Sequence, residues 1–295
     1  MILGTSALAL VILAAVAVMA LAHGGGSSAA PRKPVAALAV HRAAPATTSH
    51  ATVERPLAGL EARGDATIRR LATLGLPVYC AGPHGNEVAF TFDDGPGPYT
   101  HYAVKKLTQS HERATFFVVG RSMGFFPGWL PKELKVAAIG DHTLTHPVLP
   151  DLPPGQIATE IATTKREIQQ QTGQPVLLFR PPYGAIDPTV LRTAEHLGLL
   201  PIMWTVDSAD SLGANWAGII RNVEAGLHPG SIILMHENRG QTIRALTTLL
   251  PELQRRHLRS VSLPELFATD PPSVAQVRRG SLGCEQEVKT STASG

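Results

Sequence analysis

The hydrophobic pattern switches repeatedly between strand-like and helix-like spacing over residues 85–267. Short apolar runs predict strands, and stretches with apolar residues three or four apart predict helices between them. The predicted strands are residues 88–92, 114–119, 136–139, 176–179, 202–206, 232–235 and 260–262. The predicted helices are residues 99–109, 128–135, 154–171, 188–196, 215–226 and 242–256. Strand and helix therefore alternate about seven times, which is typical of a parallel α/β architecture.

The length and turn chemistry of this region favour a barrel over a dinucleotide-binding sheet. No Gly-x-Gly-x-x-Gly turn follows any predicted strand, and that turn is what positions a pyrophosphate in the dinucleotide-binding fold. In a parallel barrel the carboxyl ends of all the strands lie on one face, where active sites are built. We therefore expect the functional residues to follow the strands.

The two ends of the chain differ from this central region in composition. Residues 2–22 are uncharged and almost wholly apolar, which predicts a signal peptide or an N-terminal membrane anchor, although no lysine or arginine precedes them. Residues 23–78 predict a flexible tether with a short helix over 57–74, and 269–295 predict a polar C-terminal tail. A single folded domain is expected between them, over 79–268.

Composition and charge exclude some functions. The chain has 295 residues, 44% of them hydrophobic and 17% charged, with a formal net charge of +3. No run of lysine and arginine is interleaved with aromatic residues, so nucleic-acid binding is not expected. Cys80 and Cys284, the two cysteines, lie on either side of the central region and are predicted to form a disulfide if the chain is exported, with two free thiols as the alternative.

The first predicted strand ends at two adjacent carboxylates. Val88, Phe90 and Phe92 alternate with smaller or polar residues up to Asp93 and Asp94, and the segment Gly-Pro-Gly-Pro follows. Two adjacent carboxylates repel each other unless a cation or a shared proton lies between them. Taken alone, the pair favours a solvated loop.

Polar side chains capable of chemistry also follow four other predicted strands. They are Asp141, His142 and His146; Arg180 and Tyr183; Asp207 and Asp210; and His236. Each has an ordinary structural explanation, such as a surface ion pair for an arginine or a buried hydrogen-bonded side chain for a histidine. Their joint arrival at one face of a barrel favours a catalytic site.

His142 and His146 are four residues apart, so on a helical turn both imidazoles would face the same way. Two imidazoles and one carboxylate make a common site for a divalent metal, with a coordination position left open. With Asp94 at a neighbouring strand end, the sequence predicts a metal site formed by Asp94, His142 and His146.

The remaining polar residues then take separate roles around such a metal. Asp93 can accept a proton from water, and Arg180 can hold Asp93 ionised and oriented. His236 can donate a proton to a leaving amine, and Asp210 can hold that imidazole charged and aligned.

Four motifs in this order resemble those of the polysaccharide deacetylases, also called carbohydrate esterase family 4 or NodB-homology enzymes. The motifs are Thr91-Phe-Asp-Asp-Gly95, His142-Thr-Leu-Thr-His146, Arg180-Pro-Pro-Tyr183 and Leu234-Met-His236, and the resemblance spans about residues 88–267. It implies a distorted (β/α)7 barrel and metal-dependent removal of N- or O-acetyl groups from glycans.

The resemblance also implies a role for each matching residue. Asp93 is expected to be the base, Asp94 and both histidines the metal ligands, and His236 the acid. The backbone N–H of Tyr183 is expected to stabilise an oxyanion, and Pro182 and Leu234 to contact the substrate.

The sequence departs from the family at the fourth motif. Asp210 is followed by Ser211, where the family usually has a tryptophan that walls the acetyl pocket. Trp216 is hypothesised to reach back and replace it. The choice of Asp210 rather than Asp207 as the partner of the catalytic histidine rests on the match to this motif.

The resemblance implies a hydrolase acting on N-acetylglucosamine units of peptidoglycan, chitin-type oligomers or a related polysaccharide. O-deacetylation of xylan and a non-catalytic wall-binding protein of the same fold are the alternatives. The expected cofactor is a divalent metal, most simply Zn²⁺, with Co²⁺, Mn²⁺ and Ni²⁺ also compatible with the ligands. We expect a monomer that is secreted or membrane-anchored and associated with the cell wall.

Overall fold

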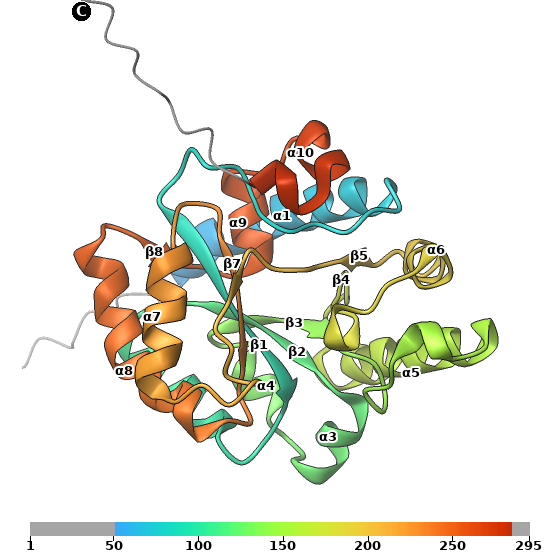
Figure 1. Cartoon of the computed structure of the whole chain (residues 1–295), viewed down its shortest axis with the longest axis horizontal. Helices are drawn as coiled ribbons and strands as arrows, with labels where there is room; N and C mark the ends of the chain where they lie inside the picture. The colour runs from blue at the N-terminus through green and yellow to red at the C-terminus, as the bar shows by residue number, and fades with distance from the viewer. Residues whose placement is uncertain (1–50, 285–295) are drawn as a thin grey trace, which may run out of the picture. The chain divides into compact units, whose positions relative to one another are not determined.

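The computed structural model describes residues 51–284 and contains one curled parallel sheet in this part of the chain (Figure 1). The strands follow the order β5-β4-β3-β2-β1-β7-β6, and β8 pairs with β1 beside this path. Their bounds are β1 (Glu87–Gly95), β2 (Ala114–Val118), β3 (Ala137–Asp141), β4 (Leu178–Phe179), β5 (Leu200–Pro201), β6 (Val206–Asp207), β7 (Ile232–His236) and β8 (Arg259–Ser260). This arrangement confirms the predicted distorted barrel.

Helices surround the sheet and connect its strands. In Figure 1, α7 and α8 lie on one side of β1, α5 and α6 lie on the other, and α1, α9 and α10 lie together. The helices are α1 (Ala51–Ala72), α2 (Thr100–Ser110), α3 (Gly120–Phe125), α4 (Leu130–Glu133), α5 (Pro154–Thr172), α6 (Pro188–His196), α7 (Trp216–Gly226), α8 (Gly240–Arg255), α9 (Leu263–Thr269) and α10 (Val274–Arg279). Short 3-10 turns occur at Leu149–Asp151, Pro182–Gly184 and Gly280–Cys284.

The period-two pattern of β1 divides its side chains between two hydrophobic clusters. Val88, Phe90 and Phe92 belong to the cluster shared with the surrounding helices α2, α5, α7 and α8. Ala89 belongs to the second cluster, which includes residues of α1 and α9. Because alternate residues of a strand point to opposite faces, Thr91 and Asp93 lie on the same face as Ala89.

The predicted strand 202–206 is wrong for most of its length, because β5 ends at Pro201 and β6 begins at Val206, and these two edge strands do not pair with each other. The N–H of Val78 donates to the carbonyl of Pro201 at 2.9 Å, and the N–H of Ala81 donates to Gly230 at 2.9 Å, so residues 78–81 bridge the gap. The Arg180 guanidinium donates hydrogen bonds to the carbonyl oxygens of Ile202 and Met203. These carbonyl oxygens therefore accept hydrogen bonds from a side chain and not from a neighbouring strand.

The segment before the domain contributes more than a tether. The helix predicted over 57–74 is longer, Ala51–Ala72, and its residues Ile68 and Leu71 are buried in the core beneath α9. The predicted signal peptide or anchor at 2–22 and the first part of the tether lie outside the described residues. Among the helices at 51–284, none has the length and hydropathy needed to cross a membrane.

The C-terminal segment is also attached to the domain as far as Cys284. Helix α10 is followed by a disulfide between Cys284 and Cys80, whose Cα atoms are 5.8 Å apart. This confirms the predicted pairing and joins the start of the domain to its end. The predicted polar tail is therefore folded up to residue 284, and residues 285–295 lie outside the described part.

Candidate active site

The paired carboxylates stand at the carboxyl end of β1, where the backbone turns sharply. Asp93 is buried, whereas Asp94 is half-buried and has a positive φ of 72°. A Cβ at Gly95 would lie 1.3 Å from Oε1 of Glu237, so only glycine fits there. Tight packing at Gly95 thus fixes the direction in which the two preceding carboxylates point.

His142 and His146 reach the same place from the loop after β3, but not on a helical turn. Thr143 and His146 have positive φ values of 67° and 62°, so the predicted helical spacing is wrong for this segment. The Thr143 N–H donates to Oδ1 of Asp141 at 2.8 Å, and the His146 N–H donates to the Thr143 hydroxyl at 3.1 Å. Side-chain hydrogen bonds stabilise the loop in place of a helix.

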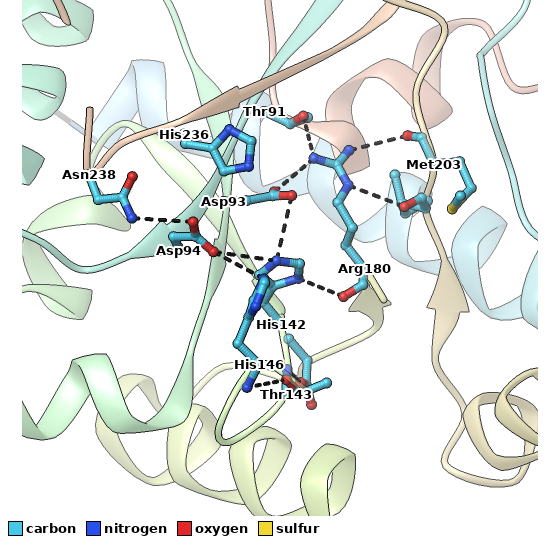
Figure 2. A network of polar contacts seen from close by, with 12 residues as sticks. Thr91, Asp93, Asp94, His142, Thr143, His146, Arg180, Met203, His236 and Asn238 are labelled. Carbon is cyan, nitrogen blue, oxygen red and sulfur yellow. Dashed lines mark hydrogen bonds and ion pairs between the residues drawn. The ribbon is translucent and has the colours of Figure 1, made fainter. Parts of the chain in front are cut away.

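The three predicted metal ligands converge (Figure 2). Oδ1 of Asp94 lies 3.3 Å from Nε2 of His146 and 3.7 Å from Nε2 of His142. The ligand atoms of these three residues all lie within 4.8 Å of one another. This separation suits three side chains that share one ion.

The chemistry of His142 fits a metal ligand. Its Nδ1 lies 2.7 Å from the carbonyl oxygen of Arg180, which can only accept, so Nδ1 carries the proton and Nε2 has a free lone pair. Burial lowers the pKa of His142 to about 3, so the ring is neutral near pH 7. A lone pair and the Asp94 carboxylate then face each other without a proton between them. Two imidazole nitrogens and a carboxylate oxygen match the donor set of zinc and related divalent ions.

Arg180 is fully buried, and all of its nitrogen atoms are engaged. Nη1 donates to Oδ1 of Asp93 at 2.8 Å and to the Thr91 hydroxyl at 2.7 Å (Figure 2). The guanidinium also lies 4.2 Å from the ring centroid of Phe117. Burial raises the pKa of Asp93, and the Arg180 guanidinium beside it opposes that rise.

His236 ends β7, beside Asp93 in the sheet register. Its Nδ1 lies 2.7 Å from Oδ1 of Asp210, whose Oδ2 accepts the backbone N–H of His236 at 2.8 Å. Burial alone lowers the pKa of His236, but the Asp210 hydrogen bond and the carboxylates of Asp93 and Asp210 outweigh it, and the pKa is raised. Asp207 instead accepts the N–H of Ala209 at 2.7 Å, so the structure pairs His236 with Asp210.

A cavity of about 570 Å³ is lined by Asp93, Asp94, His142, His146 and His236, and Arg180 and Asp210 lie behind this lining. Its other lining residues are Pro181, Tyr183, Gly184, Trp204, Asp207, Ser211, Leu212, Leu234 and Arg239. Two of the predicted substrate-contacting residues are therefore present, Tyr183 and Leu234. Pro182 is buried outside the lining, and its neighbour Pro181 takes that place.

Trp216 does not reach the cavity, contrary to our hypothesis. It packs against the outer hydrophobic cluster, and its ring lies 4.4 Å from the Arg244 guanidinium carbon. Trp204 lines the cavity instead, and Ser211 occupies the wall beside Asp210. Trp216 is the first residue of α7, and its backbone N–H donates a hydrogen bond to Oε1 of Gln241.

The sequence and the fold are similar to those of known proteins. The family model for polysaccharide deacetylase matches residues 81–202. A peptidoglycan-N-acetylglucosamine deacetylase from Bacillus cereus is 33% identical over 196 residues, which cover 64% of this chain and 71% of that protein. A chitooligosaccharide deacetylase from Bradyrhizobium is 34% identical, with 61% of this chain and 90% of that protein covered.

The chain belongs to the polysaccharide deacetylase family. A solved CE4 family pseudoenzyme from Bacillus anthracis has 29% identity and a TM-score of 0.61, over 64% of this chain and 68% of that one. The resemblance inferred from the motifs is thus confirmed. The pseudoenzyme shows that membership of the polysaccharide deacetylase family does not by itself establish turnover.

Several supporting residues of this polysaccharide deacetylase site were not predicted. Nδ2 of Asn238 donates to Oδ2 of Asp94 at 3.2 Å, which leaves Oδ1 to face the histidines. The hydroxyl of Thr242 donates to Oδ2 of Asp210. Thr91, which accepts a hydrogen bond from Arg180, was part of the first sequence motif but was given no role. The position of Asn238 two residues beyond His236 was the available signal for its role.

Two buried glutamates lie behind the turn that carries Asp93 and Asp94. Glu237 accepts a hydrogen bond from the Thr100 hydroxyl, which itself accepts the N–H of Gly97 at 2.7 Å. Oε1 of Glu237 and both carboxyl oxygens of Glu133 have no hydrogen-bond partner among the described residues. Burial raises the pKa of Glu133 to about 8, and burial together with the nearby Glu133 raises the pKa of Glu237 well above its usual value.

Glu133→Gln is expected to flatten the pH dependence of stability. Because the folded state raises the pKa of Glu133 from 4.5 to about 8, its stabilising contribution is complete below pH 4.5 and is lost as the pH rises through 8. The free energy of unfolding of the unsubstituted protein should therefore fall relative to the variant by up to about 1.4 kcal/mol per pH unit over this window.

Urea unfolding of both proteins at pH 5, 6, 7 and 8 measures this difference. Glu195→Gln removes an exposed carboxylate on α6 and is the matched control, which should leave the pH dependence unchanged. Parallel curves for Glu133→Gln and the unsubstituted protein would show that Glu133 titrates normally.

Proposed function

We propose that the chain is a metal-dependent deacetylase that hydrolyses the acetamide of N-acetylglucosamine units in peptidoglycan, chitin-type oligomers or a related polysaccharide. The observation that carries the proposal is the meeting of Asp93, His236 and the Asp94–His142–His146 cluster in one cavity. The two curated relatives act, by their names, on peptidoglycan N-acetylglucosamine and on chitooligosaccharides. A base, an acid and a ligand set at one cavity are what hydrolysis of an amide requires.

Asp93 acts as the general base in this proposal. Arg180 holds one carboxylate oxygen at 2.8 Å, which leaves the other free to accept a proton from water in the cavity. Burial raises the pKa of Asp93, and the guanidinium opposes that rise and so favours the ionised carboxylate. Thr91 and the carbonyls of Ile202 and Met203 prevent Arg180 from turning away.

His236 acts as the general acid. Asp210 accepts a hydrogen bond from Nδ1–H of His236, so in the charged ring the second proton is on Nε2, which is left for the substrate. The raised pKa favours this charged ring closer to neutral pH. The leaving amine nitrogen takes that proton as the C–N bond breaks, and acetate leaves separately. Leu234 supplies an apolar wall for the acetyl methyl group, and the backbone N–H of Tyr183, which also lines the cavity, is proposed to donate to the oxyanion.

Asp94, His142 and His146 would hold the metal ion. A divalent cation there supplies a positive centre that acidifies water and polarises the amide oxygen. The two nitrogens and one oxygen favour Zn²⁺, with Co²⁺, Mn²⁺ and Ni²⁺ as alternatives. Asn238 fixes which oxygen of Asp94 faces the cluster.

We also propose that the chain is exported as a monomer and acts at the cell wall. The apolar residues 2–22 support a signal peptide or anchor, and the Cys80–Cys284 disulfide suits an oxidising compartment. An anchored enzyme would meet its polymer outside the membrane. O-deacetylation remains the second candidate, because a relative is named a bifunctional xylanase/xylan deacetylase.

Asp93→Asn is expected to lower kcat by about 10²–10⁴-fold while the metal remains bound. The amide retains the hydrogen bond to Arg180 but cannot accept the proton from water. Acetate release and metal content of the purified variant measure the two effects separately. A kcat close to that of the unsubstituted protein would refute the assignment of Asp93 as the base.

Substrate choice is tested with reduced peptidoglycan fragments, chitooligomers and acetylxylan, each with and without a chelator. We expect acetate from the first two substrates, loss of release with chelator, and recovery on adding Zn²⁺. Acetate from acetylxylan alone would support the ester reading. No acetate from any substrate by the metal-loaded protein would support a non-catalytic binding protein.

A further inference from the structure

Exposed apolar side chains gather around the mouth of the cavity. Large hydrophobic residues that are exposed in the described part of the chain include Tyr183 and Leu212, which line the cavity and are 68% and 81% exposed. Tyr99 and Tyr102, at the start of α2, are also exposed, by 37% and 48%. Contiguous apolar surface beside a cavity marks a binding surface more often than a structural one.

Four aromatic side chains extend this surface away from the cavity. The Tyr99 ring lies against Gly240, where an added Cβ would be 3.2 Å from the ring, and Gly240 follows Arg239 of the cavity lining. Tyr102 lies one helical turn beyond Tyr99. The ring centroid of His101 is 3.7 Å from that of Tyr102 and 6.3 Å from that of Trp129. We call Tyr99, His101, Tyr102 and Trp129 the aromatic strip.

Tyr99, His101 and Tyr102 of the strip are exposed, and Trp129 is half-buried. Helix α2 buries Thr100, Ala103 and Leu107 against the core, and these residues form its inner face. His101 and Tyr102 lie on the exposed side. Replacing them should therefore leave the core intact, and their role is to be sought in solvent.

The chemistry of the strip suits sugar rings better than a lipid surface. Aromatic rings offer rigid apolar faces on which the C–H faces of β-linked sugars stack, while the tyrosine hydroxyls and His101 offer hydrogen-bond partners for sugar hydroxyls. The Lys132 ammonium lies 4.1 Å from the centroid of the Trp129 ring and adds a positive charge at the far end. The strip is also continuous with the cavity through Arg239, as an extended polymer requires.

We propose that the aromatic strip binds the sugar units of a glycan strand that lie beyond the unit held in the cavity. This inference rests on the proposed function, since the glycan is the expected substrate. With such a surface, the protein would have a higher kcat/KM for polymer strands, which are long enough to extend from Arg239 to α2, than for short oligomers. The strip is a binding surface and takes no part in bond breaking.

The test is the double variant Tyr102→Ala/Trp129→Ala, measured on long and short substrates. For a peptidoglycan or chitin polymer, kcat/KM is expected to fall about tenfold, because two aromatic anchors are lost. For an N-acetylated disaccharide, kcat/KM should stay within about twofold, because its one unit beyond the cavity would meet Tyr99, the part of the strip nearest the cavity, and would not extend to Tyr102 and Trp129. An equal fall on both substrates, or no fall on the polymer, would overturn the proposal.

Binding without turnover separates this inference from the proposed function. In the Asp93→Asn background, the double variant should sediment with insoluble chitin or peptidoglycan about tenfold more weakly than Asp93→Asn alone. Unchanged sedimentation would refute the strip whether or not the chain releases acetate. Strip-dependent sedimentation without acetate release by the unsubstituted chain would support the strip and refute the proposed hydrolysis.

Two controls sharpen the result. Phe125→Ala removes an aromatic ring that is 76% exposed on α3 and is not one of the four in the strip. This variant should therefore leave kcat/KM unchanged on both substrates. Tyr102→Phe/Trp129→Phe keeps the ring faces and should restore most of the polymer binding. Loss of binding to phosphatidylglycerol vesicles in the alanine variant, with polymer binding unchanged, would assign the strip to a membrane surface and overturn the proposal.

Discussion

The buried guanidinium of Arg180 is the interaction on which most of the site depends. Nη1 of Arg180 donates the hydrogen bond that orients Asp93, and the backbone carbonyl oxygen of Arg180 accepts a hydrogen bond from Nδ1–H of His142. Its remaining donors bind the carbonyls of Ile202 and Met203, at the place where β5 and β6 fail to pair. One residue thus orients the base through its side chain, sets the tautomer of a metal ligand through its backbone carbonyl, and binds the backbone where the barrel is open.

A fully buried cation is costly unless all of its donors are bound and an anion lies beside it. Arg180 meets both conditions through Asp93, Thr91 and the two carbonyls. The charge of Asp93 is therefore balanced on one side by Arg180, which leaves Asp94 to face the histidines. Arg180 relieves the repulsion expected between the two adjacent carboxylates on the Asp93 side, and the metal proposed at Asp94 would supply the second cation.

Much of the fold was predictable because the strands follow simple patterns. The alternation of Val88, Phe90 and Phe92 predicted β1 and the end at which Asp93 and Asp94 lie. Helix α3 was missed because its sequence, GRSMGF, contains two glycines and shows no apolar period. Helix α9 was missed although Ser262 and Glu265 form a capping box, which is a signal visible in sequence.

The site was predicted in its residues more than in its geometry. His142 and His146 were correctly brought to Asp94, but by a loop with two positive φ values that local spacing cannot reveal. The placement of Trp204 in the cavity and Trp216 outside it depends on how β5 and β6 separate, which is a tertiary property. The buried carboxyl groups of Glu133 and Glu237 likewise come from elements far apart in the sequence. Both oxygens of Glu133 and Oε1 of Glu237 have no hydrogen-bond partner among the described residues.

The central claim is that Asp94, His142 and His146 form a metal site that leaves Asp93 free to act as the base. Diffraction from zinc-loaded crystals, with anomalous data at the zinc edge, tests it most directly. The account predicts one ion per chain, within about 2.0–2.2 Å of Nε2 of both histidines and of Oδ1 of Asp94. An ion bound elsewhere, or coordinated by Asp93 in place of Asp94, would contradict it.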